Sequence, residues 1–172
     1  MSLPTRQAAK SATQAQAKTG LPSYAQANAP TTTIKIQFHE AKSLVAPHLL
    51  GSTDPFIVAY FYWNGTKIGE SETIWYGTEH PSWKNENRNT FNIQLSQTEK
   101  LGESNLVVEL QHVHRRGPGY FLGCTQLDGT MLQSMSGKGK LFHQLAKKPQ
   151  VPKAKQIMVQ GQVALTIRIQ GP

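Results

Sequence analysis

From Thr31 onward, apolar and polar residues alternate along most of the chain, with the period of two that is typical of half-buried β-strands. The clearest runs are 34–38, 91–95, 106–110 and 163–169. Residues 56–63 are apolar on both faces, which predicts a strand that is covered on both sides. Asn64 and Gly65 then predict a tight hairpin, because both tolerate a positive φ, and 66–76 returns as the partner strand.

Turn signals separate these runs, and helical periodicity is almost absent. Ser96 to Glu99 has the spacing of a capping box, which predicts one helical turn that ends at Gly102. About eight short strands with turns between them are typical of a sandwich of two antiparallel sheets. The sequence therefore predicts an all-β fold, an eight-stranded antiparallel β-sandwich over residues 31–172.

The first thirty residues follow a different pattern. Residues 1–30 have no hydrophobic period, contain no acid and are rich in Ala and Gln. Prolines at positions 4, 22 and 30 interrupt them. A segment of this composition cannot bury enough apolar surface to form a core of its own. We therefore expect an extended basic arm that precedes the sandwich.

The formal net charge is +8, from 18 Lys and Arg residues against 10 Asp and Glu residues, but the excess is uneven. The arm has three basic residues, and 138–155 has six lysines, with no acid in either segment. By contrast, 31–137 holds eight basic and ten acidic residues. This pattern predicts two segments that seek anionic surfaces, of which 138–155 is a lysine-rich insert, and it disfavours a nucleic-acid partner.

Candidate chemistry is sparse. Cys124 is the single cysteine, so no disulfide can form within the chain, and no apolar run approaches the ~18 residues that span a membrane. These features favour an intracellular protein, cytoplasmic or associated with the cytoskeleton, a cilium included. The sequence has no nucleophile elbow, phosphate-binding loop or metalloenzyme helix motif. We therefore expect neither an enzyme nor a cofactor.

Three motifs, in order and spacing, resemble those of a C2 domain, the calcium- and lipid-binding β-sandwich. They are Gly51-Ser52-Thr53-Asp54-Pro55-Phe56, His80-Pro81-Ser82-Trp83-Lys84-Asn85-Glu86 and Tyr120-Phe121-Leu122-Gly123. The resemblance covers roughly residues 31–170. The first strand precedes the first loop and an extra strand closes the domain at 161–170, which resembles the second of the family's two circularly permuted topologies.

The resemblance also implies where calcium ligands would lie, in loops at one end of the sandwich. The family's aspartate positions fall on His48, Asp54, His112, His114 and Tyr120. Only Asp54 is a carboxylate, whereas calcium requires several oxygen ligands. We therefore expect a C2-like fold that does not bind calcium, with Asp54 as a structural turn residue.

The altered loop positions leave several interpretations open. His48, His112 and His114 could bind zinc, since imidazole suits that metal, or they could be loop residues without a ligand. Protonated histidines beside Arg115 and Arg116 could also form a cationic, pH-dependent tip. In the first loop, the pair Leu49-Leu50 could insert into a lipid interface or pack beneath the loop.

Two functions follow from these features. The first hypothesis is a non-catalytic, calcium-independent structural or adaptor component of a larger protein assembly, such as a cytoskeletal or ciliary lattice with an acidic surface. It would dock through the arm and through Arg115, Arg116, Lys138, Lys140, Lys147, Lys148, Lys153 and Lys155. The alternative is a peripheral membrane protein that binds anionic phospholipids electrostatically, without calcium.

Overall fold

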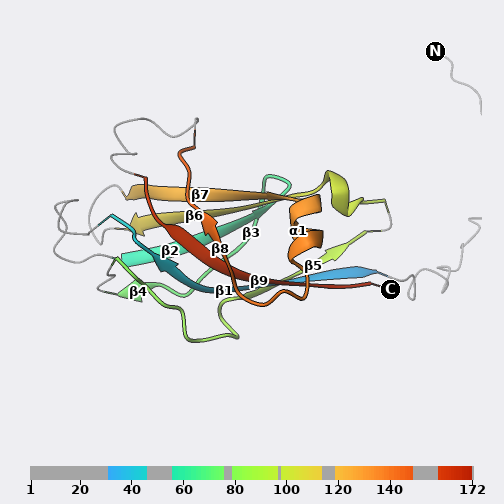
Figure 1. The fold of residues 1–172 in the computed structure, drawn as a ribbon, viewed down its shortest axis with the longest axis horizontal. Coiled ribbons are helices and arrows are strands. Elements are labelled where there is room, and N and C mark those ends of the chain that lie inside the picture. The colour runs from blue at the N-terminus through green and yellow to red at the C-terminus, as the bar shows by residue number, and fades with distance from the viewer. Residues whose placement is uncertain are drawn as a thin grey trace, which may run out of the picture.

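Two antiparallel β-sheets pack face to face in the computed structural model (Figure 1). The structure describes residues 31–45, 56–75, 79–96, 98–113, 119–148 and 159–171. The first sheet has the order β5-β1-β9-β8, with β5 (Thr90–Leu95), β1 (Thr32–Lys42), β9 (Gln162–Gln170) and β8 (Leu141–Gln144). The second has the order β3-β2-β6-β7, with β3 (Thr66–Glu70), β2 (Phe56–Trp63), β6 (Asn105–Val113) and β7 (Tyr120–Asp128).

The predicted all-β sandwich is thus confirmed, with a difference in strand number. The described residues form nine strands, because the segment predicted as one strand over 66–76 contains both β3 and the short β4 (Ile74–Trp75). Both of these strands pair with β2, which makes the second sheet five-stranded. The hairpin between β2 and β3 turns at Asn64 and Gly65, both of which have a positive φ, as predicted.

The period-two pattern places one face of each strand in the core. Ile34, Ile36 and Phe38 of β1 are at most 1% exposed and face the other sheet. The Phe38 ring lies 4.4 Å from the Trp83 ring and 5.5 Å from the Phe61 ring, measured between centroids. Burial of these apolar surfaces is what stabilises the contact between the two sheets.

The loop that contains the second motif, 80–86, pairs with the part of the β1 edge that β5 does not reach. Trp83 is 3% exposed, its backbone N–H donates to the His39 carbonyl, and its indole Nε1 donates to the Glu72 carbonyl at 2.6 Å. Asn89 is fully buried, and its carboxamide oxygen accepts the Glu72 N–H at 3.0 Å. Because both side chains bind the same backbone segment, they fix the loop against the sandwich.

The helices differ from the prediction. The Glu99 carboxylate accepts the Ser96 N–H at 3.0 Å, but among the described residues no helix starts there, and a 3-10 turn forms later, at Leu101–Glu103. The prediction missed α1 (Gly129–Met135). This helix is capped by Asp128, whose carboxylate accepts the Met131 N–H at 2.8 Å.

The lysine-rich segment 138–155 contributes directly to the sandwich. Within it, β8 pairs with β9. The chain then crosses to the second sheet, where Ala146 and Cys124 exchange two backbone hydrogen bonds of 3.0 and 2.7 Å. Residues 141–146 therefore join one edge of each sheet.

The first and last strands are neighbours. β1 and β9 pair antiparallel from Thr33 opposite Gln170 to Lys42 opposite Gln162. Figure 1 shows the start of β1 and the end of β9 at one end of the sandwich, while the start of β2, the end of β6 and the start of β7 lie at the other. We call this second end the loop end. In the part of the chain that the structure describes, no helix has the length and apolar character to cross a membrane.

Candidate functional site

The loop end is the place to which the sequence assigns a binding site, and three strands define its rim. Ile57 near the start of β2 lies opposite His112 of β6, and His112 lies opposite Tyr120 of β7. Side chains of β6 alternate between the core and the outer face up to the end of the strand. His112 therefore faces the core, as Leu110 does, and is 1% exposed. The imidazole therefore points into the end of the sandwich instead of toward solvent.

Two of the five loop positions can thus be described. The His112 and Tyr120 rings lie 6.2 Å apart between centroids, and Tyr120 is half-buried. In the described ranges, no three His, Cys, Asp or Glu side chains are grouped so that they could share a metal ion. His48, Asp54 and His114 lie outside the described residues, as do Arg115, Arg116 and the pair Leu49-Leu50. Their roles remain predictions.

An exposed aromatic side chain stands beside this rim. Trp75 is 57% exposed, and its ring meets the Phe56 ring edge-on at a centroid distance of 4.3 Å. With Val58, Tyr60 and Val113 it lines an apolar groove of about 260 Å³. Trp75 is not among the binding residues predicted from the sequence. In the sequence it is a tryptophan near the end of the predicted strand 66–76.

A second, larger groove of about 700 Å³ lies over the outer face of the sheet β3-β2-β6-β7. Its floor includes Tyr62, Glu109 and Cys124, and residues 144–148 form one wall. The Glu109 side chain is 5% exposed and forms a hydrogen-bonded ion pair with Lys148, which raises the pKa of Lys148. Burial raises the pKa of the Cys124 thiol, which favours the thiol over the thiolate at neutral pH.

The outer face of the other sheet is rich in cations. Lys35 of β1 lies directly opposite Arg168 of β9, and both are exposed. Toward the loop end, the Glu40 carboxylate binds Lys140 at 2.8 Å and Lys42 at 3.5 Å. The hydrogen bond from Lys140 is the main cause that lowers the pKa of Glu40. We call Lys35, Lys42, Lys140 and Arg168 the cationic sheet face.

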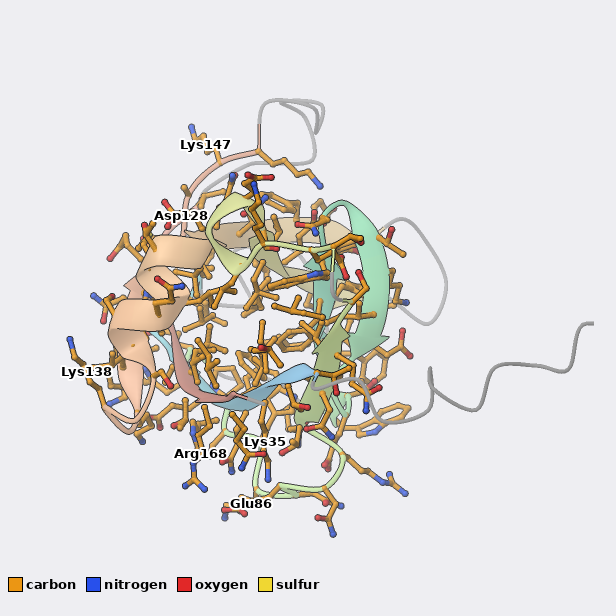
Figure 2. The ribbon with its side chains drawn as sticks, turned by 90° about the vertical axis from the view of Figure 1, so that its right-hand side faces the viewer. Lys35, Glu86, Asp128, Lys138, Lys147 and Arg168 are labelled. Carbon is orange, nitrogen blue, oxygen red and sulfur yellow. The ribbon has the colours of Figure 1, made fainter. Side chains whose placement is uncertain are left out.

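The predicted docking lysines therefore do not form one surface. Lys140 binds Glu40 on the first sheet, whereas Lys148 binds Glu109 on the second. Figure 2 shows Lys147 on the opposite side of the sandwich from Lys35 and Arg168. Lys138 follows α1 and is exposed, while Lys153 and Lys155 lie outside the described residues. The crossing of the chain at residues 141–146 causes this division.

The pKa values of two histidines, His39 and His143, indicate how the stability of the domain depends on pH. Burial, and then the charge of Lys140, lowers the pKa of His39 below its ordinary 6.5, against the opposing charges of Glu86 and Glu40. Burial also lowers the pKa of His143, whose Nε2 has no hydrogen-bond partner among the described residues. The unfolded chain therefore binds protons before the folded domain does. Stability should fall as pH decreases through about 6.5.

We expect the urea midpoint of the protein to decrease between about pH 7.5 and about pH 5.5, and His143→Leu to make this decrease smaller. Leucine suits the site, because Leu141 faces the same way on β8. Urea titrations at several pH values measure the effect. If the urea midpoint decreases with pH by the same amount in the variant and in the parent chain, the prediction for His143 is wrong.

Comparisons with known proteins agree with this architecture. The family model described as "C2 domain" matches residues 32–144. The C2 domain designated A of plant Extended Synaptotagmin 1 superposes on this chain with a TM-score of 0.58 at 14% identity. The match covers 84% of this chain and 98% of that chain. No curated protein sequence matches the chain.

Two larger structures contain a similar unit. The SMP domain and the C2 domains A and B of Extended-Synaptotagmin 2 give a TM-score of 0.56 at 15% identity, covering 85% of this chain and 29% of that chain. Human GIVD cytosolic phospholipase A2 gives a TM-score of 0.56 at 14% identity, covering 84% of this chain and 17% of that chain. At these identities the likeness is one of fold.

Proposed function

Because this chain belongs to the C2 domain family, we propose that it is a non-catalytic interaction module that works without calcium. A C2 domain is a module for interaction with lipid and calcium or with proteins. We assign this chain to the protein-binding kind, as a structural or adaptor component of a larger assembly. A cytoplasmic or cytoskeletal setting, a cilium included, suits a basic module that docks on an acidic lattice.

The cationic sheet face carries this proposal. Its four cations are accompanied by one carboxylate on these strands, Glu40. Three of the cations lie on the paired strands β1 and β9, which fix their spacing, and Lys140 directly precedes β8. Such a surface attracts an anionic partner over about a Debye length, roughly 8 Å at physiological salt. The arm, 1–30, adds three basic residues without an acid.

The loop positions support calcium independence. The resemblance places carboxylates where this chain has the buried imidazole of His112 and the phenol of Tyr120. In the sequence, Asp54 alone keeps a carboxylate among the five positions. One carboxylate leaves most of the six to eight oxygen ligands of calcium unsupplied.

The alternative function is peripheral binding to anionic phospholipids without calcium. Trp75 favours it, because this side chain is 57% exposed beside the loop end. Tryptophan is enriched where protein surfaces meet the headgroup region of a bilayer. The lysines would add about 1 kcal/mol each near an anionic surface.

Co-sedimentation and crosslinking of the full chain in a native extract test the proposal. We expect the same partners in EGTA and in millimolar calcium, and we expect deletion of 1–30 to weaken their capture. Flotation with phosphatidylserine vesicles at low salt tests the alternative. Partners that appear only with calcium would refute calcium independence, and flotation without any protein partner would favour the membrane.

A further inference from the structure

Lys35 and Arg168 form a cross-strand pair of like charges. Their Cα atoms are direct partners in the β1–β9 ladder, and both side chains are exposed. Among the residues that the structure describes, neither forms an ion pair with a carboxylate. Like charges directly opposite each other destabilise a sheet. A bound anion between the two side chains would turn this repulsion into attraction.

Polar side chains surround the pair. Lys35 lies between Arg168 of β9 and Asn92 of β5, its two partners in the sheet. Two residues further along β1, Gln37 lies opposite Thr166. The Thr166 hydroxyl is hydrogen-bonded to His39 Nε2 at 2.8 Å. The amide groups of Asn92 and Gln37 can donate hydrogen bonds to a peptide backbone and accept them from it.

The second row of cations is organised around one aromatic ring. Lys42 Nζ lies 4.3 Å and Lys140 Nζ lies 5.8 Å from the centroid of the Phe142 ring. Phe142 stands opposite Ala164 in the β8–β9 ladder and is 37% exposed, whereas Ala164 is fully buried. Among the described large apolar residues that are exposed, Phe142 alone lies on this sheet.

The outer face of the other sheet is balanced by comparison. There, Lys67 pairs with Glu70 and Lys148 pairs with Glu109. On the cationic sheet face, four cations meet the carboxylate of Glu40, and the charge of Glu86 in the adjacent loop acts on the neighbouring His39. The adjacent loop does not neutralise this excess of positive charge, because its Glu86 is accompanied by Lys84 and Arg88.

We propose that the cationic sheet face binds an acidic polypeptide segment of a partner protein, with a carboxylate bridging Lys35 and Arg168. A guanidinium binds a carboxylate through two parallel hydrogen bonds, and the lysine adds a point charge beside it. The amides of Asn92 and Gln37 would pair with the peptide backbone, and the next acidic side chain would reach Lys140. A bilayer fits less well, because one half-exposed ring offers little apolar surface for insertion.

This inference rests on the proposed function and identifies the surface and the partner chemistry. The test measures binding of the full chain to a fluorescein-labelled decaglutamate peptide by fluorescence anisotropy, with a Gly-Ser peptide of equal length as the neutral probe. We expect binding of decaglutamate that weakens with salt. The double variant Lys35→Gln/Arg168→Gln should weaken it about tenfold or more.

The matched control is Lys67→Gln/Lys100→Gln, which removes the same charge from two exposed lysines on other surfaces. It should leave the affinity within about twofold. The melting temperature of the Lys35→Gln/Arg168→Gln variant should not decrease, because the substitutions remove a repulsion. This measurement separates a lost site from a lost fold.

Two outcomes of the peptide and vesicle binding measurements would overturn the inference. One is equal loss of affinity in both double variants, which would mean that net charge alone attracts the peptide. The other is binding to phosphatidylserine vesicles that depends on Lys35 and Arg168 while decaglutamate does not bind. Calcium-independent capture of partners by the Lys35→Gln/Arg168→Gln variant would refute this surface only, whereas calcium-dependent capture by the parent chain would refute the proposed function.

Discussion

Replacing Gly129 by alanine should lower the free energy of unfolding by about 3 kcal/mol. A Cβ atom built on Gly129 would lie 1.6 Å from the Leu101 carbonyl oxygen and 2.9 Å from the Gly102 Cα. Both neighbours are backbone, so no rotamer change can relieve the contact. Gly129 opens α1, and this helix must approach the 3-10 turn closely to bury Leu132 and Met135.

Chemical denaturation of Gly129→Ala and of the parent chain measures this effect. Gly102→Ala is the matched control, because a Cβ atom there meets nothing within 4 Å. We expect the control to stay within about 0.5 kcal/mol of the parent, with the same m-value in all three proteins. Equal midpoints for Gly129→Ala and the control would show that the two backbones can separate at little cost.

Replacing Lys148 by alanine should destabilise the domain by about 2 kcal/mol. The Glu109 side chain is 5% exposed, so removal of its partner leaves a carboxylate in a desolvated groove. The Lys148 side chain is 34% exposed, so solvent weakens the pair, and the loss should be smaller than for a fully buried ion pair. The variant also loses the contact of Lys148 Nζ with the Tyr62 ring, 5.5 Å from its centroid.

The neighbouring lysine provides the control. Lys147 is exposed and has no carboxylate partner among the described residues, so Lys147→Ala should change stability by less than about 0.5 kcal/mol. The double variant Lys148→Met/Glu109→Gln should recover part of the loss, because it removes both charges together. Thermal or urea unfolding that does not distinguish Lys148→Ala from Lys147→Ala would contradict the assigned role of Glu109.

Much of the fold could be predicted because it follows from local alternation. Ile34 and Ile36 face the core as their period of two requires, and Asn64-Gly65 makes the expected hairpin. Trp83 is buried, since its motif loop packs against β1. Such features depend on residues close together in the sequence, where the pattern can be read directly.

Other features depend on contacts that no local pattern contains. The helix α1 is seven residues long, too short to give a clear helical period, although Asp128 was an available capping signal. The lysines of 138–155 looked like one basic insert, but β8 and the crossing that follows it send Lys140 and Lys148 to different sheets.

The candidate site shows the same distinction. His112 was assigned to a loop, whereas β6 extends through it and turns it inward. Lys35 and Arg168 are far apart in the sequence, and only the register between β1 and β9 makes them neighbours. The sequence therefore indicated that the surface is basic but could not indicate where its charges converge.

The pairing of β1 with β9 has a practical consequence for protein engineering. Because the start of one strand lies beside the end of the other, a short linker from Gly171 to Thr31 could join them, and new termini could be opened at the turn of Asn64 and Gly65. The domain could likewise be grafted into a surface loop of a carrier protein through two adjacent connections. Such a graft would leave the loop end pointing away from its carrier.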